Sequence, residues 1–350
     1  MATSAAAVPT RTSCARCSAR ERPDVHTFAW LRAESESDAV ASGVRGAKYL
    51  AGGTTLVDLM KQGVEQPTML VDVGRLPLAQ IEATATGGLR IGALATNTAV
   101  ARNEMVIAKY PLLSQAILSG ASPQLRNLAT TAGNLLQRTR CPYFRDPSTA
   151  CNKRTPGAGC DARGGWDRTH AVLGTSDHCI ATHPSDMCVA LVALEAVVRT
   201  KTRTGERAIA IRDFHTVPGA HPEVENVLEP GELVTYVELP ALPASTRSLY
   251  VKVRDRASYA FALASAAIVL DIDGGTIKRA RVALGGVGTK PWRAEEAERA
   301  LAGKPVRRDV FEVAAQEALR AATPGKYNAF KIDLAKRTLV SALSRAGGIA

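Results

Sequence analysis

The chain has 350 residues and a formal net charge of +11, and 46% of its residues are hydrophobic. This composition is typical of a globular protein, and the length predicts two or three domains. No apolar stretch approaches the roughly 18 residues that a membrane span needs. The basic residues are scattered and only 5% of residues are aromatic, which argues against nucleic-acid binding. An anionic cofactor and acidic partner surfaces account for the charge equally well.

The seven cysteines and the first 25 residues give two further indications. An odd number of cysteines argues against a complete disulfide framework. Residues 1–25 have neither an apolar core suited to a secretory signal nor a twin-arginine pair, so we expect a disordered extension or an over-called start site. Cys14 and Cys17 form a Cys-x₂-Cys pair in this extension. We interpret them as free, with opportunistic metal binding as the alternative.

The predicted elements alternate between strands and helices as far as about residue 240, which favours an α/β region. Strands are predicted at 27–33, 47–50, 68–72, 89–92 and 233–239. Helices are predicted at 35–42, 56–62, 97–109 and 112–119, the last two separated at Pro111. The apolar run at 186–198 predicts a helix that leads into a strand.

A linker at 241–245 leads into a further unit. Its apolar periodicity predicts strands at 249–254 and 279–283, a helix or strand at 261–270 and a turn at 273–275. Helices are predicted near 294–301, 310–321 and 332–346.

Two glycines stand between a predicted strand and a predicted helix in the sequence LAGGTTL at 50–56. Glycine permits positive φ and close approach of a ligand. Thr54 or Thr55 is suited to cap the helix, and Asp58 has capping-box spacing from Thr55. Free N–H groups there would suit a pyrophosphate; the alternative is a plain strand–turn–helix connection. The run GGVGTK at 285–290 lacks the P-loop ending and is interpreted as a turn.

Four cysteines, Cys141, Cys151, Cys160 and Cys179, fall in a long segment without apolar periodicity. A loop of this length usually has a function, and four thiols could close around a metal centre. Their spacing is wider than the Cys-x₂-Cys of ferredoxins and common zinc sites, so iron–sulfur, zinc and no metal all remain open.

Four more residues near the cysteine segment invite interpretation. Cys188 is expected to be a buried small hydrophobe. His170, His178 and His183 surround the fourth cysteine of the segment. We expect them to be solvent-facing loop residues, with zinc ligation as the alternative.

The sequences ASPQLRN at 121–127 and TTAGNL at 130–135 resemble the second flavin-binding segment of the FAD-binding subunit of molybdenum hydroxylases, the xanthine dehydrogenase family. AGGTTL at 51–56 resembles the first segment. Ser185-Asp186 and the stretches at 230–234, 250–254, 283–287 and 328–330 resemble further family segments in the same order. The resemblance covers roughly residues 27–346.

The cysteine segment narrows this resemblance. LQRTRCPYFRDPSTACNKRTPGAGC at 136–160 is similar to the flavin subunit of bacterial aldehyde oxidoreductases, a branch with an additional [4Fe–4S] cluster. The 4-hydroxybenzoyl-CoA reductase type also has a cluster loop, and resembles it less.

The resemblance implies an α+β fold. FAD-binding α/β domains of the PCMH/vanillyl-alcohol-oxidase type would occupy residues 26–240 as two subdomains. A [4Fe–4S] loop would be inserted at about 138–182. A C-terminal α/β domain of the CO-dehydrogenase flavoprotein type would occupy residues 246–350.

The resemblance also implies the binding residues. The FAD pyrophosphate would be held by backbone amides of Leu50, Ala51, Gly52, Gly53, Thr54, Thr55 and Leu56. The second segment would bind FAD through Thr131, Gly133 and Asn134. Asp186 would hydrogen-bond the ribityl or ribose side, and Val234 and Lys252 would flank the ring. The cluster would be bound by Cys141, Cys151, Cys160 and Cys179, with its charge offset by Arg138, Arg140, Arg145, Lys153 and Arg154.

The implied function is electron transfer, with no catalytic side chain, because the cofactor carries the redox chemistry. Electrons would pass from a molybdopterin-binding large subunit that oxidises an aldehyde, through a [2Fe–2S] small subunit, to FAD and an external acceptor. Alternatives are a xanthine-dehydrogenase-like or 4-hydroxybenzoyl-CoA-reductase-like subunit, a stand-alone flavin enzyme, and a zinc-stapled interaction protein without catalysis. The expected location is the cytoplasm, or the periplasm by co-export with a signal-bearing partner.

Overall fold

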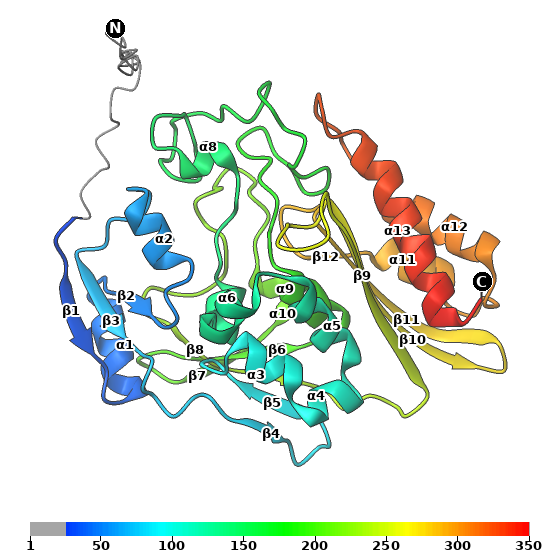
Figure 1. Ribbon diagram of the computed structural model, residues 1–350, viewed down its shortest axis with the longest axis horizontal. Coiled ribbons are helices and arrows are strands. Elements are labelled where there is room, and N and C mark those ends of the chain that lie inside the picture. The colour runs from blue at the N-terminus through cyan, green and yellow to red at the C-terminus, as the bar shows by residue number, and fades with distance from the viewer. Residues whose placement is uncertain (1–25, 350) are drawn as a thin grey trace, which may run out of the picture.

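The computed structural model describes residues 26–349. The expectations for residues 1–25, including Cys14 and Cys17, lie outside this range. Three sheets with their helices follow one another along the chain, and the cysteine segment, residues 138–182, lies beside all of them (Figure 1). No helix within the described range is long and apolar enough to cross a membrane.

The first unit is a three-stranded parallel sheet with the order β1-β3-β2. Its elements are β1 (Ala29–Arg32), α1 (Glu36–Val44), β2 (Lys48–Leu50), α2 (Leu56–Lys61) and β3 (Met69–Asp72). Ser35 caps α1 by accepting a hydrogen bond from the backbone N–H of Asp38 at 3.1 Å. Val40 of α1 packs with Val71 of β3 in the core of this unit.

The second unit is a five-stranded antiparallel sheet with the order β4-β5-β8-β6-β7. Its strands are β4 (Ile81–Ala83), β5 (Leu89–Gly92), β6 (Val197–Lys201), β7 (Glu206–Ala210) and β8 (Leu233–Leu239). Its helices are α3 (Asn97–Arg102), α4 (Glu104–Lys109), α5 (Pro111–Ser119), α6 (Pro123–Leu128), α7 (Thr131–Leu135), α9 (Asp186–Ala193) and α10 (Ile211–Phe214). One short helix, α8 (Pro142–Arg145), lies in the cysteine segment.

The predicted single helix at 97–109 is wrong, because the chain forms α3 and α4 there. Asn103 ends α3 and caps α4, and its Oδ1 accepts from the backbone N–H of Met105 at 3.0 Å and of Val106 at 3.3 Å. Asparagine competes for backbone hydrogen bonds and therefore favours caps. Pro111 is the first residue of α5, where its missing N–H costs nothing.

The third unit is an antiparallel sheet with the order β12-β11-β10-β9, covered on one face by helices (Figure 1). Its elements are β9 (Thr246–Val253), β10 (Ala264–Asp273), β11 (Thr276–Gly285), β12 (Trp292–Arg293), α11 (Glu295–Leu301), α12 (Arg308–Ala318) and α13 (Phe330–Gly347).

Strand β10 joins two cores. Ala266 and Ile268 pack into the core beneath the C-terminal helices, whereas Ala267 and Val269 pack into the main core of the second unit. Successive side chains of a strand point to opposite faces, so both faces of β10 are buried. The continuous apolar run therefore could not distinguish a helix from a strand at 261–270.

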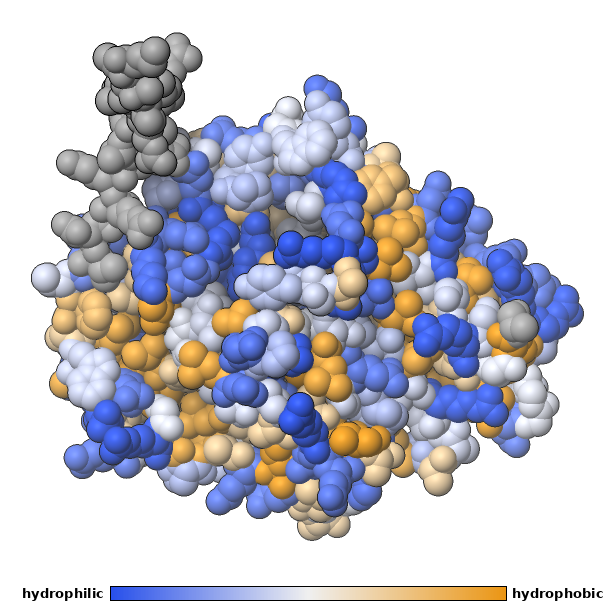
Figure 2. All heavy atoms as spheres, in the orientation of Figure 1, coloured by the Kyte–Doolittle hydropathy of each residue, from blue (hydrophilic) through white to orange (hydrophobic). Residues whose placement is uncertain are grey.

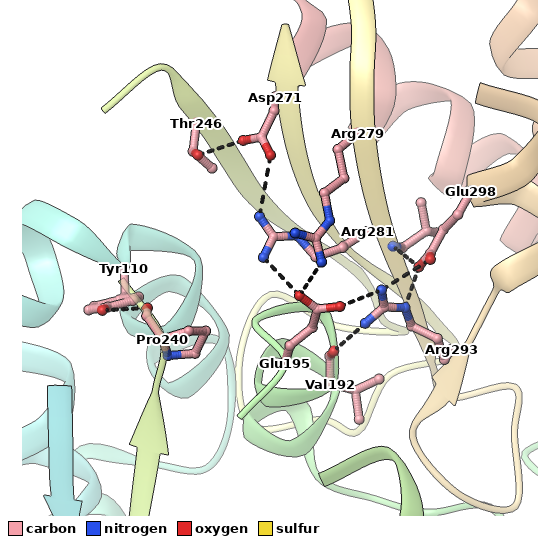
Figure 3. A network of polar contacts seen from close by, with 11 residues as sticks. Tyr110, Val192, Glu195, Pro240, Thr246, Asp271, Arg279, Arg281, Arg293 and Glu298 are labelled. Carbon is pink, nitrogen blue, oxygen red and sulfur yellow. Dashed lines mark hydrogen bonds and ion pairs between the residues drawn. The ribbon is translucent and has the colours of Figure 1, made fainter. Parts of the chain in front are cut away.

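A charged network joins the end of α9 to the third sheet (Figure 3). Glu195 has a φ of +56° and accepts hydrogen bonds from Arg279 at 2.7 Å, Arg281 at 3.3 Å and Arg293 at 3.2 Å. The Arg281 side chain is only 4% exposed. Buried guanidinium groups need carboxylate partners, so Glu195 ties the second unit to the third electrostatically.

The surface differs from one side to the other. In the view of Figure 2, hydrophilic residues gather over the upper half, where Figure 1 places α2 and the cysteine segment. Apolar residues gather at the left edge, near β1. Trp30 and Leu31 of this edge strand are 48% and 42% exposed. An exposed apolar sheet edge is a surface that proteins usually cover.

Candidate functional site

A cavity of about 940 Å³, which we call the main cavity, lies where the three units and the cysteine segment meet. This size is at the upper end of the roughly 300–1,000 Å³ of small-molecule sites. The first unit contributes Thr54 and Thr55, the second contributes α6 and α7, and the third contributes Lys252 and Gly286. One ligand could therefore contact all three units.

The first glycine segment connects β2 to α2. Leu50 ends the strand and Leu56 begins the helix, with Ala51, Gly52, Gly53, Thr54 and Thr55 between them. Only Thr54 and Thr55 are among the residues that line the main cavity. The role of this segment in holding a pyrophosphate stays a prediction.

Position 52 requires glycine because of a close backbone approach. A Cβ atom on Gly52 would collide with the carbonyl oxygen of Leu128 at the end of α6. Gly53 has a φ of +68°, in the left-handed region that glycine favours. The glycine segment at 50–56 therefore packs directly against the end of α6, which belongs to the second segment that resembles a flavin-binding segment.

The predicted capping box at the start of α2 is wrong. Thr55 occupies the N-cap position but its side chain makes no capping hydrogen bond. Asp58 instead pairs with Arg145 of α8, so the first unit is bonded to the cysteine segment. The Thr55 hydroxyl is left free for a ligand in the main cavity.

The second segment forms α7 at the cavity wall. Thr130 caps the helix, because its Oγ1 accepts from the backbone N–H of Gly133 at 3.2 Å. Thr131 is buried and its Oγ1 donates to the carbonyl of Ala95 at 3.0 Å. Gly133 and Asn134 line the main cavity, whereas Thr131 does not. Thr131 therefore holds the segment in place from behind.

Asn134 connects this segment to α9. Its Oδ1 accepts from Ser185 Oγ at 2.6 Å. Ser185 in turn caps α9, accepting from the backbone N–H of Cys188 at 3.0 Å. Residues far apart in the sequence are thus fixed side by side in the wall of the main cavity.

Asp186 bridges the second and third units. Its Oδ2 pairs with Lys252 Nζ at 2.8 Å, and its Oδ1 accepts from Tyr250 Oη at 2.6 Å. Both partners come from β9, two residues apart, and so lie on one face of that strand. Lys252 also donates to the carbonyl of Ser119 at 3.0 Å. The carboxylate and the ammonium group are held rigidly at the main cavity, which both residues line.

Val234 lies elsewhere. It is buried in the main core and is not among the residues that line the main cavity. The structure therefore does not bring Val234 to the site with Lys252.

The main cavity fits a polar, anionic ligand. Asn97, Arg145 and Ser265 line it, and each keeps a buried polar atom without a hydrogen-bond partner. Such atoms normally find partners. Arg126 and Arg140 also line the cavity. Burial and then the nearby Arg145 lower the pKa of Arg140 to about 10, so it remains a cation at neutral pH. A flavin dinucleotide would supply both hydrogen-bonding groups and phosphate charge.

Cys141, Cys151, Cys160 and Cys179 come together in what we call the cysteine cage. The four residues line one small cavity, and all four are free thiols. Burial raises the pKa of Cys141 to about 12, so without a metal this side chain would be a thiol at neutral pH. A cation in the cage would reverse this, because a coordinating thiol deprotonates.

The width of the cysteine cage distinguishes between metals. Tetrahedral zinc with bonds of about 2.3 Å brings its sulfur ligands within about 4 Å of one another. Across the described residues, the only group of three candidate ligand atoms within 4.8 Å of one another lies outside the cage. No three of the four cage sulfurs are therefore that close.

Lys153 is the one residue lining the cysteine cage among the five basic residues expected to offset the cluster charge. Its Nζ pairs with Glu225 at 3.1 Å. Arg138 pairs with Glu65 and Glu225, both at 2.5 Å. Arg154 donates to backbone carbonyls of the cysteine segment. These residues hold the segment together as much as they set its charge.

The cysteine cage and the main cavity share a wall. Cys141 lines both, and its Sγ lies 3.2 Å from Nε2 of His170, which also lines the main cavity. The expectation of solvent-facing histidines holds for His178, which is exposed, but is wrong for His170, which is 2% exposed, and for half-buried His183. Cys188 is fully buried, as predicted.

The C-terminal unit holds the cysteine segment from outside. Asp167 accepts from the backbone N–H groups of Lys326 at 2.8 Å and Tyr327 at 2.7 Å. Lys331 of α13 is buried, and its Nζ donates to the carbonyls of Thr169 at 3.1 Å and His170 at 2.8 Å. The position of His170 beside Cys141 therefore depends on α13.

Known protein families account for this arrangement. Residues 26–242 match the model described as FAD binding domain in molybdopterin dehydrogenase. Residues 249–346 match the CO dehydrogenase flavoprotein C-terminal domain. This chain belongs to the FAD-binding subunits of the molybdenum hydroxylase family. The expected α+β fold, an FAD-binding region followed by a flavoprotein C-terminal domain, is confirmed.

Individual relatives agree with this assignment. The chain is 52% identical to aldehyde oxidoreductase FAD-binding subunit PaoB of Escherichia coli (strain K12), over 91% of this chain and 98% of that protein. It is 29% identical to the glyceraldehyde dehydrogenase medium chain of Sulfolobus acidocaldarius, over 81% and 84%. The solved CO dehydrogenase from Oligotropha carboxidovorans has a TM-score of 0.73 at 26% identity, covering 93% of this chain and 99% of that one.

This FAD-binding subunit is therefore part of an oxidoreductase, and the alternative of a non-catalytic interaction protein is wrong. Sequence reasoning did not select several residues that line or brace the main cavity: Asn97, Arg126, Tyr250 and Ser265. Tyr250 had a detectable signal, because it precedes Lys252 by two positions on the same strand. Arg126 lies in the ASPQLRN segment that resembles a flavin-binding segment, whereas Asn97 and Ser265 had no such signal.

Proposed function

We propose that this chain is the FAD and iron–sulfur electron-transfer subunit of a heteromeric, molybdenum-containing aldehyde oxidoreductase. The observation that carries the proposal is the wall shared by the main cavity and the cysteine cage, at Cys141 and His170. It places a flavin-sized space beside four free thiols in one chain.

FAD fits the main cavity. The pyrophosphate would lie near Thr54 and Thr55, with Arg126 and Arg140 to balance its charge. Asp186 and Lys252 would orient the remainder of the cofactor. Bound FAD supplies acceptance and release of electrons, and the protein supplies position and electrostatics. The rigid Asp186–Lys252 pair is suited to positioning because neither group needs to reorganise.

A [4Fe–4S] cluster fits the cysteine cage. Four thiols from one segment meet the ligand count of a cubane, and their separation exceeds that of a zinc site. His170 would donate Nε2–H to Cys141 Sγ at 3.2 Å, and such hydrogen bonds tune cluster potentials. We assign the cluster ligands as Cys141, Cys151, Cys160 and Cys179.

Two partner subunits are proposed, a molybdopterin-binding large subunit and a [2Fe–2S] small subunit. The support comes from relatives, such as the 6-hydroxypseudooxynicotine dehydrogenase complex subunit alpha of Paenarthrobacter nicotinovorans, 28% identical over 91% of this chain. The aldehyde substrate follows the names of two relatives. The exposed apolar edge at Trp30 and Leu31 is suited to a subunit contact. Location in the cytoplasm, or in the periplasm with an exported partner, stays part of the proposal.

Anaerobic addition of an aldehyde to the co-expressed complex tests the function. We expect the flavin absorbance to bleach. The Gly52→Ala variant should lose FAD, because its Cβ would collide with the carbonyl of Leu128. Aldehyde oxidation with an artificial acceptor that takes electrons upstream of FAD should persist in that variant.

The matched control is Gly303→Ala. Gly303 has a φ of +72° but open space around it, so alanine there costs only about 1 kcal/mol of backbone strain. It should retain FAD and full electron transfer. Flavin that stays oxidised in a complex that turns over aldehyde would contradict the proposed function.

A further inference from the structure

Two buried side chains, Cys188 and His215, and the half-buried His183 are not used by the proposed flavin or cluster sites. A ring nitrogen of His183, a ring nitrogen of His215 and Sγ of Cys188 all lie within 4.8 Å of one another. Within the described part of the chain, no other three candidate ligand groups are so close. Two imidazoles and a thiol are a common donor set for zinc.

The two histidines have free ring nitrogens. His183 Nδ1 accepts from the backbone N–H of Ser185 at 3.3 Å, and its Nε2 is buried without a partner. Nε2 therefore carries the proton of the neutral ring, and binding a metal there would move that proton to Nδ1 and break the bond from Ser185. His215 Nε2 bonds the carbonyl of Leu135 at 2.9 Å, and its Nδ1 is buried without a partner. His215 is only 5% exposed. Buried polar atoms without partners are uncommon and call for an explanation.

The hydrogen bond to Leu135 also fixes the tautomer of His215. A ring nitrogen that donates to a carbonyl leaves the other with a lone pair, which is the usual arrangement behind a metal-bound histidine. Burial lowers the pKa of His215 to about 4, so the ring is neutral at neutral pH. Nδ1 of His215 is therefore ready to bind a cation.

The basic residues near the three side chains affect metal binding in two ways. Lys153 and Arg140 lie close enough to His183 to help lower its pKa, after burial and His215. They disfavour a bare cation, but they also keep His183 neutral. Cys188 is fully buried with no basic partner, and a bound metal would deprotonate it. The thiolate would then offset one of the two charges of zinc.

We propose that His183, Cys188 and His215 form a zinc site distinct from the cysteine cage. A third cavity of about 40 Å³, lined by both histidines, leaves space for one water as the fourth ligand. The site would tie the end of the cysteine segment to α9 and to the connection after α10. This proposal does not depend on the presence of FAD or of a cluster.

Zinc binding by the anaerobically purified, full-length chain in its complex tests the proposal. After a chelator wash, equilibrium dialysis against zinc with metal analysis should find about one zinc per chain at this site. Cys188→Ala and His215→Gln should each weaken this binding by more than about 100-fold, because they remove a ligand. Cys188→Ala keeps the small apolar volume at the start of α9.

The matched control is His221→Gln. His221 is exposed and pairs only with Glu223 at 3.2 Å, so its variant should bind zinc as the wild type does. Iron is counted in every sample, which separates zinc at this site from zinc that occupies the cysteine cage. Zinc should also raise the thermal denaturation temperature of the wild type but not of Cys188→Ala.

Two results would overturn the proposal. One is a wild-type chain that takes up no zinc while its iron content is unchanged. The other is a Cys188→Ala variant that binds zinc as tightly as the wild type. The first result is measured on the wild type alone, so the proposal can be tested even if the variants fail to fold.

Discussion

Asp186 at the start of α9 and Lys252 on β9 form an ion pair of 2.8 Å between the second and third units, with side chains 9% and 4% exposed. Removing one partner of a buried pair is costly because the other charge stays buried. We expect Lys252→Met to lower the free energy of unfolding by about 3 kcal/mol and to reduce FAD content. Denaturant titration and flavin quantification of the purified variant measure both.

The control for this pair lies at the other end of the same sheet. Lys278 pairs with Asp273 at 3.7 Å, and both side chains are well exposed. Lys278→Met should cost less than about 1 kcal/mol. Replacing both charges, in Asp186→Asn with Lys252→Met, should restore part of the lost stability. Equal losses of unfolding free energy in Lys252→Met and Lys278→Met would show that the buried Asp186–Lys252 pair stabilises the protein no more than an exposed ion pair does.

Glu195 and its three arginines (Figure 3) predict a pH-dependent stability. Burial raises the pKa of Glu195, but Arg279, Arg293 and Arg281 outweigh it, and the net pKa is lowered from 4.5. A lowered folded-state pKa stabilises the fold above the unfolded pKa, and this contribution is lost as the pH falls through the folded value. Glu195→Gln should cost about 1–2 kcal/mol at neutral pH.

Denaturation of wild type and Glu195→Gln across acidic pH measures this effect. The difference between them should shrink as the pH falls below about 4. Glu312→Gln is the control, because its pair with Arg308 is exposed on both sides. A difference at Glu195 that persists unchanged in acid would contradict the ionic account.

Lys331 predicts a stability that also rises with pH, but in a higher pH range. Burial, and then Arg168, lower its pKa from 10.5 to about 7. Between these values the unfolded chain binds a proton that the folded chain does not, so the free energy of unfolding rises with pH. Lys331→Met should remove this part of the rise. Exposed Lys304 gives the control, since Lys304→Met should keep it; identical pH profiles for wild type and Lys331→Met would refute the prediction.

The cysteine cage predicts a difference between two of its ligands. Cys160 lines the cage alone, whereas Cys141 lines the main cavity as well. Cys160→Ser should therefore lose iron and retain FAD, and Cys141→Ser should lose iron and bind FAD more weakly. Iron and flavin analysis of both variants measures the difference. Equal FAD retention in the two would mean that the shared wall does not matter for the flavin.

Much of this arrangement was accessible from the sequence. The strand–glycine–helix order at β2 and α2 was visible because glycine and periodicity act locally. The run at β10 was ambiguous, since burial on both faces removes the alternation that identifies a strand. The break at Asn103 was missed because one capping side chain outweighed a continuous helical pattern.

The site was harder to predict where it depends on tertiary contacts. Only the family resemblance indicated a role for Asp186 and Lys252 in the site. Their contact joins the second unit to the third, so no local sequence pattern could predict it. The burial of His170 follows from Lys331 and Asn328, which lie over 150 residues away. No local pattern reports such a contact. Thr131 and Val234 were predicted to contact FAD, but both are buried and neither lines the main cavity. A segment shared with a family includes residues that support the fold as well as residues that line the cavity.

The central claim is that one chain holds FAD and a four-iron cluster in adjacent sites. Quantifying iron, acid-labile sulfide and FAD in the anaerobically purified complex, with the Cys160→Ser variant beside the wild type, tests it most directly. We expect the wild type to contain about four more iron and four more sulfide per FAD than the variant. Equal iron in the two proteins, or zinc in place of iron in the wild type, would contradict the account.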